Sequence, residues 1–154
     1  RTAAAINDRF PAAAHPPIVL VAEHHEPDAV YEYHRASDIC FVSSLHDGMN
    51  LVAKEFVAAR DDEQGVLVLS HFAGASRELP EALVVNPYDA DECAAALHRA
   101  LSMPPAEQTS RMRIMRGIVR EFNVYRWAGR MLLDAAVMRE RSPFGATGTA
   151  QGKF

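Results

Sequence analysis

Apolar and polar residues alternate in blocks along the chain, and these blocks predict strands and helices in turn. Short apolar runs rich in branched side chains predict four strands, at 18–23, 38–43, 65–70 and 82–87, and Pro87 ends the last of them. Apolar residues spaced by three and four positions predict helices at 28–37, 49–60, 89–103, 105–122 and 124–140. The segment 71–82 predicts a glycine-containing loop with one helical turn.

The order of these elements predicts the fold class. Strands that are apolar on both faces and alternate with helices are typical of an α/β fold with a parallel sheet between helices. We therefore expect a partial doubly wound parallel sheet followed by C-terminal helices, with residues 1–141 as one domain. The tail 142–154 is small, polar and glycine-rich, which predicts disorder. Ligands of such sheets bind beyond the carboxyl ends of the strands.

Composition narrows the class of protein further. The 154 residues carry a net charge of −4, which gives no sign of a nucleic-acid surface, and the late arginines fit a solvated helix face. Cys40 and Cys93 lack metal-ligand spacing and are expected to be buried thiols of a cytoplasmic protein without a metal or cofactor. No apolar run approaches the ~20 residues of a membrane span, and no signal peptide is evident. The start at Arg1 instead of Met indicates a fragment of a longer protein.

The stretch LHDGMNLVAKEFVAAR, residues 45–60, carries the candidate chemistry. It follows the predicted strand 38–43, and the first N–H groups of its helix have no partner inside the helix. Gly48 would let a ligand approach the backbone, and the helix dipole favours a negative charge there, so we expect a phosphate or diphosphate site. The candidate donors are Asn50 and the amides of Met49, Leu51 and Val52.

Glu55 adds a second acid, inside an otherwise apolar face and about 10 Å along the helix from Gly48. A carboxylate there suits sugar hydroxyls, so the ligand would be a nucleotide or a sugar nucleotide. A purely structural alternative stays open, in which Asp47 caps the helix, Gly48 turns the chain and Glu55 pairs with a Lys or Arg. The loop SHFAGAS, residues 70–76, should lie beside the first loop, and its small residues either admit a ligand or only make a tight turn.

Three segments together resemble a known family: DICFVSSLHDGMNLVAKEFVAAR, GVLVLSHFAGASREL and ALVVNPYDADECAAALHRAL. They resemble the trehalose-6-phosphate synthases, glycosyltransferase family 20, over about residues 38–101 and more weakly to 136. The resemblance implies a retaining glucosyltransferase of the two-domain GT-B fold. Its donor would be UDP-glucose or GDP-glucose, its acceptor glucose 6-phosphate and its product trehalose 6-phosphate. The family is thought to act by front-face attack, with the leaving diphosphate taking the proton of the acceptor.

The resemblance also implies roles for single residues. Asp47 would contact glucose hydroxyls and is the catalytic candidate, while the backbone from Gly48 to Val52 would hold glucose and diphosphate oxygens. Glu55 would accept bonds from the ribose hydroxyls. The base would lie against the segment near His25 and Val30. His25 stands where an aromatic residue is common, so the choice between uridine and guanosine stays open, and His46 stands where an arginine is common.

Family members are much longer than this chain, and the resemblance places the acceptor pocket in an N-terminal domain. We therefore expect glucose 6-phosphate to be bound mainly by that missing domain, and this chain to supply the donor-binding part. The last helix would cross to the other domain, which would leave Met131, Leu132 and Met138 exposed in its absence. The alternative function is a non-catalytic nucleotide-sugar-binding or interaction module. Assembly into a homo-oligomer stays open.

Overall fold

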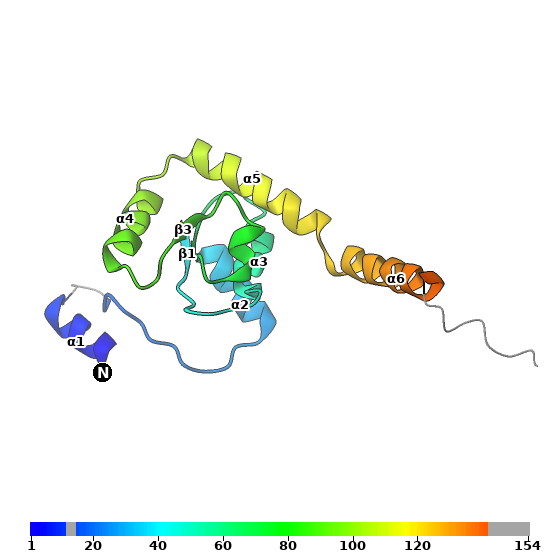
Figure 1. Ribbon diagram of the computed structural model, residues 1–154. Helices are drawn as coiled ribbons and strands as arrows, with labels where there is room; N and C mark the ends of the chain where they lie inside the picture. The colour runs from blue at the N-terminus through cyan, green and yellow to red at the C-terminus, as the bar shows by residue number, and fades with distance from the viewer. Residues whose placement is uncertain (12–14, 142–154) are drawn as a thin grey trace, which may run out of the picture. The chain divides into compact units, whose positions relative to one another are not determined.

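A computed structural model describes residues 1–11 and 15–141, and the chain divides into two compact units between Val30 and Tyr31. The first unit holds α1 (Thr2–Arg9) and the start of α2 (Pro27–Ala36), as Figure 1 shows. Within this unit the Asn7 side chain donates to the Ile18 carbonyl and accepts from its amide, both at 2.8 Å. The prediction of one domain over 1–141 stays a prediction, and the tail 142–154 lies outside the described residues.

The strand predicted at 18–23 is wrong. These residues form no strand, and the side chains of Val19 and Leu20 are mostly exposed. A β-branched run fits a sheet only where a neighbouring strand pairs with it, and no strand of the described residues does so. Helix α1 is an element that the hydrophobic pattern did not indicate.

The second unit is built on a parallel sheet of three strands, β1 (Ile39–Val42), β2 (Val66–Ser70) and β3 (Leu83–Val85), in the order β1-β2-β3. Cys40 lies opposite Leu67, and Val68 lies opposite Leu83. These strands confirm three of the four predicted. The other elements of this unit are α3 (Leu51–Ala59), the 3-10 turn η1 (Gly74–Arg77), α4 (Ala90–Leu101), α5 (Pro105–Glu121) and α6 (Val124–Arg141).

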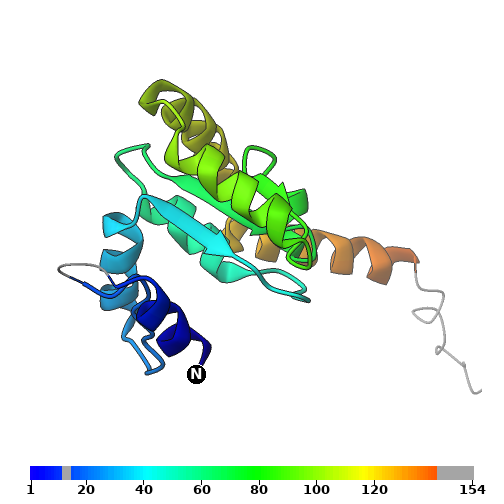
Figure 2. The same cartoon turned by 90° about the vertical axis from the view of Figure 1, so that its left-hand side faces the viewer.

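Helices cover both faces of this sheet, and every residue of its central strand β2 is therefore buried. Leu67 and Leu69 belong to the apolar cluster of α3 and α5, which includes the fully buried Phe56. Val66 and Val68 point to the other face and belong to the cluster of α4. Figure 2 shows α3 and α4 on opposite sides of the sheet. The predicted α/β class, a parallel sheet between helices followed by C-terminal helices, is confirmed.

Arg60 ties the end of α2 to the end of α3. Its guanidinium group is almost fully buried, and it donates to the carbonyls of His34, Arg35 and Ser37. The last carbonyls of a helix have no partner inside the helix, so Arg60 satisfies the C-terminal end of α2. Asp62 pairs with the same guanidinium through two bonds, at 3.0 and 2.9 Å. This contact fixes where α2 lies against α3.

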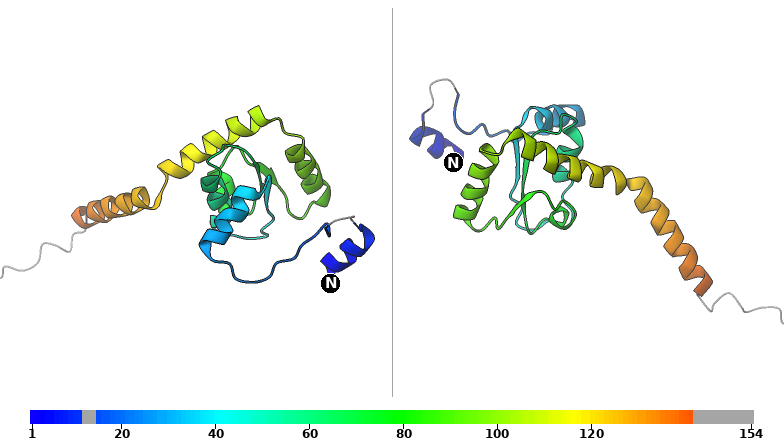
Figure 3. Two further views of the ribbon diagram at one scale, coloured as in Figure 1. Left: turned by 180° about the vertical axis from the view of Figure 1, so that it is seen from behind. Right: turned by 90° about the horizontal axis from the view of Figure 1, so that it is seen from above.

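The chain breaks between α5 and α6. The Asn123 side chain accepts bonds from the amides of Tyr125 and Arg126 and so starts a new helix. Figure 3 shows α6 running outward from the end of α5, away from the sheet. Among residues 1–11 and 15–141, no helix is both long enough and apolar enough to cross a membrane.

Candidate functional site

The loop after β1 is organised by the Asp47 carboxylate. One of its oxygens accepts a bond from the Met49 amide at 3.1 Å, and the other accepts from the Asn50 side chain at 2.9 Å. These bonds, first that from Asn50 and then that from Met49, lower the pKa of Asp47 below its ordinary value. Asp47 is thus held ionised. A carboxylate has about four acceptor positions, and the bonds from Met49 and from the side chain and backbone of Asn50 leave one for a ligand hydroxyl.

Asn50 is the N-cap of α3. Its side-chain oxygen accepts from the Ala53 amide at 2.9 Å, and its backbone has a φ of 72°, in the left-handed region. The residue is 7% exposed, and both ends of its amide are engaged within the loop. The prediction that the Asn50 side chain donates to a phosphate is therefore not supported in this conformation. Asparagine tolerates positive φ and is favoured at N-caps, so the residue type at position 50 was the feature of the sequence that could have indicated a capping role.

Two backbone amides remain free at the start of α3. The helix begins at Leu51, two residues later than predicted, and neither the Leu51 nor the Val52 amide has an acceptor among the described residues. The Met49 amide, a third predicted donor, is occupied by Asp47. The anion site expected from the sequence thus narrows to Leu51 and Val52, beyond the carboxyl end of β1.

Gly48 faces open space. A Cβ atom built on this residue would meet nothing within 4 Å, and its φ is not positive. Neither chain conformation nor packing against the described residues therefore requires a glycine here. The open space leaves the backbone of the loop accessible to a ligand.

The loop after β2 lies beside the first loop, as predicted. Asp47 and Ala73 form a parallel bridge, the Gly74 amide donates to the Asp47 carbonyl at 2.9 Å, and the Ala75 amide donates to the Met49 carbonyl at 2.7 Å. A Cβ on Gly74 would lie 2.1 Å from the Gly48 carbonyl oxygen. The small residues of this second loop therefore serve the packing of the two loops. The suggestion that they admit a ligand is wrong for Gly74.

Glu55 lies on an exposed side of α3, and its neighbours one turn away in each direction are the apolar residues Leu51, Val52, Ala58 and Ala59, so the face around it is apolar as predicted but is largely open to solvent. The buried residues Ala53, Phe56 and Val57 lie on the side of the helix opposite Glu55, and the buried Ala59 follows Glu55 one turn later. Glu55 forms no hydrogen bond or ion pair within the described residues, so the alternative in which it pairs with a Lys or Arg has no support there. Lys54 pairs instead with Glu78 at 2.8 Å.

His25 and Val30, the residues predicted to lie against the base, belong to the first unit and are half-buried there. Their place beside the nucleobase stays a prediction.

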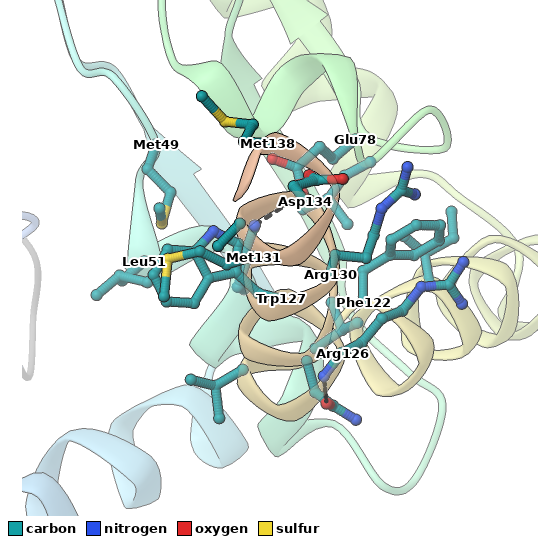
Figure 4. Close-up of a pocket in the computed structure, with 17 residues that line it drawn as sticks. Met49, Leu51, Glu78, Phe122, Arg126, Trp127, Arg130, Met131, Asp134 and Met138 are labelled. Atoms are coloured by element: carbon teal, nitrogen blue, oxygen red, sulfur yellow. Dashed lines mark hydrogen bonds and ion pairs between the residues drawn. The ribbon is translucent and has the colours of Figure 1, made fainter. Parts of the chain in front are cut away.

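A mainly apolar groove of about 1100 Å³ borders the start of α3. Figure 4 shows side chains of α6, among them Trp127 and Met131, facing Met49 and Leu51 across it. On α6 the side chains of Met131, Leu132 and Met138 are 50%, 69% and 72% exposed. The exposure predicted for these three residues is thus confirmed.

Known proteins match this chain over most of its length. The trehalose-6-phosphate synthase of Klebsiella pneumoniae is 48% identical over 138 residues, 89% of this chain and 29% of that protein. An α,α-trehalose-phosphate synthase (UDP-forming) from Burkholderia xenovorans, solved in complex with glucose-6-phosphate, matches with a TM-score of 0.83 and 46% identity, over 86% of this chain and 29% of that one. The α,α-trehalose 6-phosphate synthase from Burkholderia multivorans matches with a TM-score of 0.87 and 41% identity, over 96% of this chain and 32% of that one.

The chain spans less than a third of the length of these relatives. The profile of glycosyltransferase family 20 matches residues 1–136, most of the chain. The chain therefore belongs to glycosyltransferase family 20.

Proposed function

We propose that this chain is the donor-binding part of a retaining glucosyltransferase. The enzyme moves glucose from UDP-glucose to glucose 6-phosphate and gives trehalose 6-phosphate. Membership of the family supports this proposal, as do the relatives, which are named as trehalose-6-phosphate synthases, one of them UDP-forming and solved with glucose-6-phosphate.

The observation that carries the proposal is the start of α3. The unpaired amides of Leu51 and Val52 lie beyond the carboxyl end of β1, and the space over Gly48 is open. A helix N-terminus with free N–H groups suits the diphosphate of a nucleotide sugar. Asp47 then lies on the glucose side of this anion site and Glu55 one helical turn inside α3, where it would accept bonds from the ribose hydroxyls.

The ionised state of Asp47 limits its chemistry. A carboxylate whose pKa is lowered accepts hydrogen bonds from sugar hydroxyls, and it is a poor proton donor to the leaving group. We therefore assign Asp47 to orientation of the glucose. The proton of the acceptor hydroxyl passes to the departing diphosphate as the new glycosidic bond forms on the same face. The Leu51 and Val52 amides stabilise the charge that develops on that diphosphate.

A second function, a nucleotide-sugar-binding module without turnover, is favoured by the chemistry of the site, because the ionised Asp47 and the free amides of Leu51 and Val52 suit binding of a donor and not transfer of a proton. Calorimetry of the chain with UDP-glucose and GDP-glucose tests donor binding and the choice of base. A turnover assay with UDP-glucose and glucose 6-phosphate then separates the two functions. Binding with turnover supports the enzyme, binding without turnover supports the module, and absence of binding contradicts both.

A further inference from the structure

His34 lies against α3 in a setting that does not suit a charge. This residue is on α2, and its ring meets the Phe56 ring edge-on, with 5.9 Å between centroids and 73° between planes. Phe56 is completely buried. The Nε2 atom of His34 is also buried and has no hydrogen-bond partner within the described residues. Burial accordingly lowers the pKa of His34, so the ring is neutral at neutral pH.

Glu55 is the acid that acts on this histidine. It precedes Phe56 on α3, and its negative charge works against the larger effect of burial and raises the pKa of His34. The carboxylate is exposed and has no hydrogen bond or ion pair of its own within the described residues. It is therefore free to move toward a new positive charge on α2.

Other charged groups near His34 are already paired. The Arg60 guanidinium lies 3.3 Å from the His34 carbonyl and is held by Asp62. Arg35, the next residue of α2, forms an ion pair with Asp61. Among these groups Glu55 is the one acid without a fixed cation.

We propose that His34 is a positioning residue for Glu55. This proposal rests on the donor site proposed above. Neutral His34 leaves the Glu55 carboxylate free to accept bonds from the hydroxyls of the nucleotide sugar. Protonated His34 attracts this carboxylate and draws it from the ligand. Donor binding therefore weakens at acidic pH, as His34 becomes protonated.

Calorimetry with UDP-glucose at about pH 7.5 and about pH 5 tests this inference, since its diphosphate diester does not change charge in that range. For the unmodified chain we expect the Kd to rise about fivefold at the lower pH, the effect of one exposed ion pair. His34→Phe keeps an aromatic ring against Phe56 but cannot be protonated, so its Kd should change much less. His98→Phe removes an exposed histidine from α4, on the opposite face of the sheet, and should behave like the unmodified chain.

Glu55→Gln provides a second variant, independent of the packing of His34. It keeps an acceptor for the sugar hydroxyls, but protonated His34 no longer attracts it, so its pH dependence should also be weak. His46 precedes Asp47, but it is present in every variant, so any effect that it has on binding cancels in the comparison.

A smaller pH effect in both His34→Phe and Glu55→Gln supports the inference. An equal pH effect in these variants and the unmodified chain overturns it and leaves the donor site standing. Absence of UDP-glucose binding by the unmodified chain at about pH 7.5 overturns the donor site itself, and the inference with it.

Discussion

Substitution of Gly48 by alanine or valine should weaken ligand binding at the proposed site without unfolding the chain. A Cβ at this residue meets nothing within 4 Å, and the backbone there does not have the positive φ that favours glycine. The folded chain should therefore tolerate Gly48→Ala with a change in the free energy of unfolding below about 1 kcal/mol. The added carbon atoms, however, project into the space through which a diphosphate would reach the amides of Leu51 and Val52.

The expected loss of binding follows from those two amides. Each hydrogen bond from a backbone amide to a charged oxygen contributes about 1.5–3 kcal/mol, so loss of both weakens binding by about 3–6 kcal/mol, a hundredfold or more in Kd. Gly48→Ala should give a partial loss and Gly48→Val the full loss. Calorimetry with UDP-glucose measures the Kd, and urea unfolding of the same samples measures stability.

Unchanged affinity for UDP-glucose in a folded Gly48→Val protein would refute the reasoning. It would mean that the donor does not approach the backbone at Gly48, whatever else binds it.

Three further substitutions test other parts of the structure. Glu55→Ala, in an enzyme completed with its acceptor domain, should raise the donor KM tenfold or more through loss of two ribose hydrogen bonds of about 1 kcal/mol each, and an unchanged KM would remove Glu55 from the site. Gly74→Ala places a carbon 2.1 Å from the Gly48 carbonyl oxygen, so we expect the free energy of unfolding in urea to fall by about 2 kcal/mol and donor binding to weaken. An unchanged free energy of unfolding would mean that the two loops are not in contact. Arg60→Met leaves the carbonyls at the end of α2 without donors and Asp62 without its cation, so we expect a loss of about 3 kcal/mol in urea unfolding, and a loss below about 1 kcal/mol would contradict the role given to Arg60.

Most elements of the second unit could be predicted from the sequence, because each is marked by the pattern of apolar residues within its own segment. The runs at 39–42, 66–70 and 83–85 are almost wholly apolar, and helices with clear apolar spacing follow the first and the third of them. The run at 18–23 has the same composition but no partner strand among the described residues. Composition reports the tendency of a segment to pair, and a strand forms only when a neighbour is present.

The candidate site could be located from the sequence but not resolved in detail. The loop at Asp47 and Gly48 lies where the pattern placed it, beyond the end of β1 and beside the loop of Gly74. The occupation of the Met49 amide by Asp47 and the left-handed backbone of Asn50 depend on the folded loop. The contact of Arg60 with α2 joins segments far apart in the sequence, which periodicity cannot reveal.

The most direct test of the proposed donor site is a crystal structure of the chain with UDP-glucose bound. The account predicts diphosphate oxygens within hydrogen-bond distance of the Leu51 and Val52 amides, with the glucose toward Asp47. Diphosphate density elsewhere on the chain, with the start of α3 unoccupied, would contradict it.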